Sequence, residues 1–139
     1  MSRSGYSDDL DNWTLIRWRG AVKSSIRGWR GQAFLREMLA ALDALPEKRL
    51  IAEELETDGE VCALGAVGRA RGIDMSNIDP EDYDAVSSTF GIPDALAREI
   101  MNVNDEYLWW KDATPEKRFD CVRNWVVRKL TTSKQEISG

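Results

Sequence analysis

Apolar residues recur at every third or fourth position along most of this chain, and that spacing constrains the fold more than any other feature. A helix that buries one face against its neighbours has this pattern. The clearest stripes are Leu15, Trp18, Val22 and Ile26, then Phe34, Leu35, Met38, Leu42 and Leu45, then Leu96, Ile100, Val103 and Tyr107, and finally Phe119, Val122, Val126 and Leu130. The sequence therefore predicts helices at about residues 11–27, 32–45, 61–71, 80–90, 93–107 and 115–130.

Proline and glycine mark the ends of several of these segments. Asp79-Pro80 and Thr114-Pro115 each place a capping oxygen before a proline and acids after it, which is typical of a helix N-terminus. Gly72 is expected to end the third helix. Gly28 and Gly31 are expected to separate the first helix from the second, with Trp29 in the connection.

Residues 49–62 are the ambiguous part of the helical pattern. Their composition favours helix, but Thr57-Asp58-Gly59 is a turn signal, so the segment is either a helical turn or a small β-hairpin. Gly65 and Gly68 are expected to let another helix approach closely. We predict an all-α fold, a compact bundle of five to seven helices forming one domain over residues 1–139, with flexible ends at 1–10 and 131–139.

The chain has no histidine and two cysteines in 139 residues. This composition excludes Ser-His-Asp and Cys-His nucleophiles, two-histidine metalloprotease sites and the usual structural zinc sets. Cys62 and Cys121 are far apart in the sequence, and we expect reduced, buried or half-buried thiols. We therefore expect no enzymatic activity, no cofactor and no metal, and favour a binding protein.

Neither a targeting signal nor a membrane span is apparent. The N-terminal residues carry acids and no apolar core, unlike a signal peptide. No apolar run approaches the roughly 20 residues that a membrane-spanning helix needs. We expect a soluble cytoplasmic protein with no membrane partner.

The net charge of -5 conceals a strong segregation of sign. Residues 1–36 carry a formal charge of +4, residues 37–116 carry -13 and residues 117–139 carry +4, and no acid lies between Asp11 and Glu37. One interpretation is that the basic ends pack against acidic segments and cancel their charge. The other is that a basic or acidic surface attracts a charged partner.

The glycine-rich segment Gly65–Gly72 lacks the spacing of the known phosphate-binding loops, so a nucleotide site is not expected there. Arg69 and Arg71 within it either pair with acids such as Asp74 or Asp79, or grip an anion on a partner. The acids Asp74, Asp79, Glu81, Asp82 and Asp84 could in principle hold magnesium, but helix capping and the helix dipole already explain Asp79, Glu81 and Asp82, and the group lacks EF-hand spacing.

Two acidic segments are the candidate partner-binding surface. Negative charge at this density could mimic a nucleic-acid duplex, although a solvated acidic face is the commoner explanation. Tryptophans beside charged residues in a loop are candidate interface anchors. The candidate residues are Glu53, Glu54, Glu56, Asp58, Glu60, Asp79, Glu81, Asp82, Asp84, Trp109 and Trp110.

The basic first helix is the alternative binding surface. Arg19, Lys23 and Arg27 recur every fourth residue beside its apolar stripe, and Arg30 follows shortly after. Phosphate contacts by such bases, with tryptophans for base stacking, are typical of nucleic-acid binding. The overall acidity and the absence of a DNA-reading motif weigh against this interpretation.

Much of the chain resembles a family of small uncharacterised phage and prophage proteins. The segments that carry this resemblance are residues 4–9, 18–22, 30–56 and 59–74 and, more loosely, 90–92 and 104–106. The resemblance supplies no catalytic residue. It implies a protein of the bacterial host cell that binds a host complex stoichiometrically.

Two hypotheses follow. The first is an anti-CRISPR-like protein that inhibits a host defence complex, a protein or nucleoprotein, through the acidic segments. The alternative is a phage protein that binds nucleic acid through the basic first helix. A small enzyme ranks third.

Overall fold

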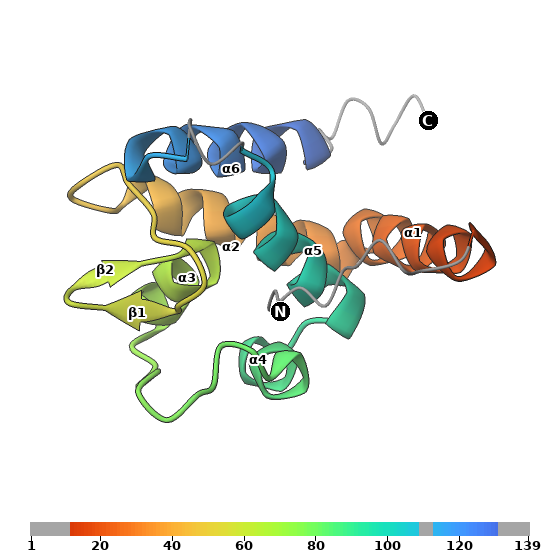
Figure 1. The fold of residues 1–139 in the computed structure, drawn as a ribbon, viewed down its shortest axis with the longest axis horizontal. Helices are drawn as coiled ribbons and strands as arrows, with labels where there is room; N and C mark the ends of the chain where they lie inside the picture. The colour runs from red at the N-terminus through yellow and green to blue at the C-terminus, as the bar shows by residue number, and fades with distance from the viewer. Residues whose placement is uncertain (1–11, 109–112, 131–139) are drawn as a thin grey trace.

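The computed structural model describes residues 12–108 and 113–130, so the predicted flexible ends lie outside the described residues (Figure 1). Within these ranges the chain forms six α-helices and one two-stranded sheet. The all-α prediction is confirmed. The elements are α1 (Asn12–Arg27), α2 (Trp29–Asp43), β1 (Glu56–Thr57), β2 (Glu60–Val61), α3 (Ala63–Arg71), α4 (Tyr83–Phe90), α5 (Asp94–Glu106) and α6 (Pro115–Lys129).

The core forms where α2, α3, α5 and α6 meet, because their apolar stripes face one another. Helix α2 packs against α1, α3 and α6, and α5 packs against α1, α3, α4 and α6. The largest fully buried side chains include Trp125, Phe90, Leu35, Met38 and Leu42. Figure 1 shows α1 at one end of the molecule's long axis and the β-hairpin at the other.

Residues 56–61 form a β-hairpin, so the hairpin alternative for this region is right. Glu56 pairs with Val61 and Thr57 with Glu60 in antiparallel register. Asp58 and Gly59 have φ angles of 53° and 82°, the two positive values that a type I′ hairpin turn requires. Tertiary hydrogen bonds hold the preceding irregular segment in place, since the Leu50 N–H donates to the Pro115 carbonyl at 3.0 Å and the Ile51 N–H donates to the Val61 carbonyl at 2.9 Å.

A buried polar network ties this segment to the core. The Asn104 side chain accepts a hydrogen bond from the Ala63 N–H and donates to the Ile51 carbonyl. The buried Arg118 guanidinium donates to the carbonyls of Asn104 and Leu50, at 2.9 and 3.2 Å. Because buried polar groups are costly unless they are hydrogen-bonded, this network fixes residues 50–63 against α5 and α6.

Two helix starts differ from the sequence prediction. Trp29 is the first residue of α2 and not part of a connection, because Gly28 alone turns the chain between the helices. The expected cap at Asp79 is also wrong. Asp79 accepts from the Glu81 N–H in a tight turn, and Asp82 caps α4 by accepting from the Ala85 N–H. The predicted Thr114 cap of α6 is confirmed.

The two glycines of α3 are close to other groups, but not to another helix as expected. A Cβ at Gly65 would lie 1.9 Å from the Leu55 carbonyl oxygen, and one at Gly68 would lie 2.4 Å from the Met75 sulfur. Gly72 ends α3 with a φ angle of 72°, as predicted. The glycines therefore let the hairpin and the loop after α3 pack onto this helix.

Both thiols match the sequence prediction. Cys62 is buried and free, and its sulfur caps α3 by accepting from the Gly65 N–H. Cys121 is free and half-buried, and burial raises the pKa of its thiol. Among the helices that the structure describes, none is both long and apolar enough to cross a lipid bilayer.

Candidate nucleic-acid interface

Helix α1 buries one face and exposes large apolar side chains on the other. Val22 and Ile26 are buried against the core. Trp13, Ile16 and, just after the helix, Trp29 are 68, 61 and 76 % exposed. Trp13 and Ile16 lie near the start of α1 and Trp29 follows its last turn, so large apolar side chains are exposed at both ends of the helix.

The bases of α1 are not neutralised by the rest of the described chain. Residues 12–36 contain six bases and no acid. Arg17, Arg19, Lys23 and Arg27 have no carboxylate within 4.0 Å, counting residues 12–108 and 113–130. The Arg30 guanidinium lies over the Trp29 ring, 5.4 Å from its centroid. Among the residues that the structure describes, no carboxylate therefore cancels the charge of these four bases.

The basic C-terminal helix behaves differently. Arg123 on α6 binds Asp43 at the end of α2 through two hydrogen bonds, of 2.7 and 3.1 Å. This pair lowers the pKa of the Asp43 carboxyl. Charge cancellation therefore occurs between α6 and α2.

An arginine between two aromatic rings holds α1 in place. The Arg98 guanidinium of α5 lies 4.3 Å from the Trp18 ring centroid and 4.4 Å from that of Tyr83 on α4. Cation–π contacts of this geometry contribute about 0.5–2 kcal/mol each, depending on solvent exposure. The stack therefore links α1 to both α4 and α5.

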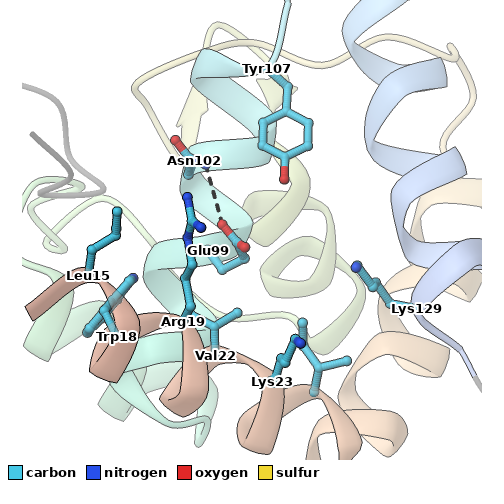
Figure 2. Close-up of a pocket in the computed structure, with 10 residues that line it drawn as sticks. Leu15, Trp18, Arg19, Val22, Lys23, Glu99, Asn102, Tyr107 and Lys129 are labelled. Carbon is cyan, nitrogen blue, oxygen red and sulfur yellow. Dashed lines mark hydrogen bonds between the residues drawn. The ribbon is translucent and has the colours of Figure 1, made fainter. Parts of the chain in front are cut away.

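A groove of about 390 Å³ runs between α1, α5 and the C-terminal end of α6. Figure 2 shows the side chains of Arg19, Lys23, Lys129 and Tyr107 directed into the same space from these three helices. Its floor is apolar and includes Val22. The groove therefore combines positive charge, an aromatic ring and an apolar floor.

Glu99 and Asn102 form the polar wall of the groove on α5. The Asn102 side-chain amide donates to the Glu99 carboxylate at 3.3 Å (Figure 2). Burial and the nearby Glu99 charge raise the pKa of Tyr107, so its hydroxyl stays protonated and able to donate. Tyr107 was expected on the buried stripe of α5, but it is 47 % exposed at the mouth of the groove.

The two arginines of α3 have structural partners, and neither partner is the predicted Asp74 or Asp79. Arg71 forms a two-point pair with Glu37, at 2.7 and 2.6 Å, and lowers the pKa of that carboxyl. Arg69 donates to Glu56 at 3.2 Å and to the Gly59 carbonyl at 2.6 Å. These contacts account for both arginines without an external anion.

The acidic candidates fall into paired and unpaired groups. Glu56 pairs with Arg69 and Glu60 with Arg49, while Asp79 and Asp82 serve turns and caps. The remaining candidates are solvent-exposed: Glu53, Glu54, Asp58, Glu81 and Asp84.

Figure 1 shows the hairpin at the opposite end of the long axis from α1. Asp84 is nearer to α1, because it follows Tyr83 on α4, and Tyr83 and Trp18 of α1 both stack on Arg98. Asp84 approaches Asp94 at the start of α5, and burial together with the Asp84 charge raises the pKa of Asp94. Trp109 and Trp110 lie outside the described residues, so their anchor role stays a prediction.

Sequence reasoning missed several residues of this surface. Arg17 and Trp13 could have been found, because they belong to the same acid-free run as Arg19. Lys129 and Tyr107 could not have been found from the sequence, since they reach the groove from segments far along the chain.

Neither a metal-binding cluster nor a similar protein points to a ligand or partner of this chain. Within the described residues, no three carboxylate or thiol side chains lie together where they could hold a metal ion. Comparisons of the chain with protein-family models, curated proteins and solved structures each give no match. The family resemblance expected from the sequence therefore stays a prediction.

Proposed function

We propose that the protein binds nucleic acid through α1 and the start of α2. The observation that carries this proposal is the row of bases on α1 that have no carboxylate partner within residues 12–108 and 113–130, with an exposed tryptophan near each end of the helix. Lysine and arginine side chains that lack an internal partner are free to replace the counterions of a phosphate backbone. Exposed indole rings offer stacking surfaces for bases.

The acidic remainder of the molecule does not prevent this binding. Ionic strength near the physiological value screens exposed charges beyond about 8 Å. The sixteen residues of α1 span about 24 Å, and the acidic hairpin lies at the far end of the long axis (Figure 1). A nucleic acid on α1 would therefore experience the local positive charge rather than the net charge of -5.

The double variant Arg17→Gln/Arg27→Gln tests the proposal. Fluorescence anisotropy with a labelled oligonucleotide, titrated at several salt concentrations, gives the affinity and its salt dependence. We expect the wild-type affinity to fall steeply with salt, with a log–log slope of about -3 to -4 for four phosphate contacts. The variant should bind about tenfold or more weakly, with a slope smaller by about two.

The matched control is Lys48→Gln/Lys117→Gln, which removes the same charge near the end of α2 and the start of α6. Its affinity should stay close to that of the wild type. Equal weakening by both variants would show that only net charge matters. Absence of binding by the wild type at low salt would reject the proposal.

A second candidate function uses the acidic side. It is the stoichiometric inhibition of a host defence complex, anti-CRISPR-like, and its support is the exposed acids of the hairpin region. Glu54 and Asp58 are exposed and have no cation within 4.0 Å among the described residues. A basic nucleic-acid groove on another protein would be complementary to such a surface.

Phage plating tests this second candidate. If it holds, a CRISPR-immune strain that expresses the protein should plate a targeted phage as efficiently as a strain without immunity. Reversing charge with Glu54→Lys/Asp58→Lys should abolish that effect, whereas the control Glu116→Lys/Asp120→Lys on α6 should keep it. No gain in plating with the wild type would count against the candidate for the immune system tested.

A further inference from the structure

We propose that the groove between α1, α5 and the end of α6 holds one unstacked nucleotide of a single-stranded nucleic acid. This inference rests on the proposed function and deepens it, because it assigns a preference for single strands over duplexes. The occupant is inferred from the charge, ring and hydrogen-bonding groups that converge on the groove.

The bases that line the groove suit a phosphate. Arg19 and Lys23 enter from α1, and Lys129 enters from the end of α6 on the other side (Figure 2). With Glu99 included, the charged side chains that line the groove carry a net formal charge of +2. Three cations that converge from two helices favour a compact anionic group over an extended apolar one.

The ring and the floor suit a nucleobase. Tyr107 is 47 % exposed at the groove mouth, so one face of its ring is accessible for stacking. The Arg98 guanidinium already occupies a position against Trp18, which leaves Tyr107 as the principal stacking ring. Base–aromatic stacking tolerates any base, because every base has a π face.

The polar wall suits the edge of a base. Asn102 offers both an amide donor and a carbonyl acceptor, and Glu99 offers carboxylate acceptors for an exocyclic amino group. Glu99 repels the carboxylates of an acidic peptide, and such side chains have no ring that could stack on Tyr107. The groove is therefore matched to a nucleotide rather than to an acidic peptide.

The size of the groove favours a single strand. At about 390 Å³ it lies at the small end of the range for ligand pockets, roughly 300–1,000 Å³. A base paired inside a duplex cannot enter a recess of this kind without being unstacked, which costs a few kcal/mol. A single strand avoids most of that cost.

Anisotropy titrations of the full chain with a labelled 12-nucleotide single strand and with the blunt duplex of the same sequence test the inference. We expect the wild type to prefer the single strand. Tyr107→Ala should weaken single-strand binding about tenfold or more and leave duplex affinity unchanged. Tyr107→Phe keeps the ring and should restore single-strand binding.

Val127→Ala is the matched control, since Val127 is also 47 % exposed but lies outside the groove lining. It should change neither affinity. Equal affinity for both ligands, or equal weakening of both by Tyr107→Ala, would overturn the groove inference and leave the binding by α1 intact. No binding of either ligand would overturn both. Polyglutamate that competes as well as the single strand would identify an acidic-protein site instead.

Discussion

Replacing Arg118 with methionine is expected to lower the free energy of unfolding by about 3–5 kcal/mol. Methionine keeps the length of the side chain but removes its hydrogen-bond donors. The carbonyls of Asn104 and Leu50 would then lose their bonds to the guanidinium in a buried environment. Each buried acceptor left without a partner costs about 1–3 kcal/mol.

Urea unfolding followed by far-UV circular dichroism measures this loss. Arg123→Met is the matched control on the same helix, because Arg123 binds Asp43 at the surface, where the two side chains are 39 and 47 % exposed. An exposed ion pair contributes about 0–1 kcal/mol. If both variants lost the same free energy, the buried network around Asn104 would not be stabilising residues 50–63.

Gly31→Ala is expected to destabilise the protein by about 1–3 kcal/mol or more, through a backbone clash where α1 meets α2. A Cβ at Gly31 would lie 1.8 Å from the carbonyl oxygen of Ser25. That oxygen belongs to the backbone of α1 and cannot rotate away, so the helices would have to separate. Because α1 carries the proposed binding surface, separation should also weaken oligonucleotide binding.

Gly20→Ala is the control for this prediction. Gly20 lies in the middle of α1, and a Cβ there would meet nothing within 4 Å. Alanine at an exposed helix position is about 0.5–1 kcal/mol more favourable than glycine, so the melting temperature should rise. A fall in melting temperature for Gly20→Ala, or none for Gly31→Ala, would contradict the close approach of the two helices.

The segment from Leu50 to Cys62 marks the limit of what local pattern could predict. Its composition favours helix, yet it forms an irregular segment that leads into a hairpin, because the Leu50 and Ile51 N–H groups donate to the carbonyls of Pro115 and Val61. The Thr57-Asp58-Gly59 turn was recognisable, since a type I′ turn depends only on two adjacent residues. The hydrogen bonds that Leu50 and Ile51 donate to other parts of the fold could not be recognised from the sequence.

The candidate site likewise has some features that the local sequence predicts and others that depend on tertiary contacts. The basic residues Arg19, Lys23 and Arg27 were predictable as one helical face, because i, i+4 spacing is a local property. The sequence did not predict which charged side chains form ion pairs. Arg71, for example, pairs with Glu37 rather than with a sequence neighbour.

The sequence alone determined the approximate positions of the helices, the turn at Thr57-Asp58-Gly59 and the separation of charge, because periodicity, turn residues and composition act over a few residues. Only the tertiary structure decided which bases stay unpaired and where a groove forms, since Arg19 and Lys129 meet across the fold. It also decided that Arg118 reaches Leu50, 68 positions away in the chain. Such contacts depend on the packing of whole helices, and no local pattern encodes them.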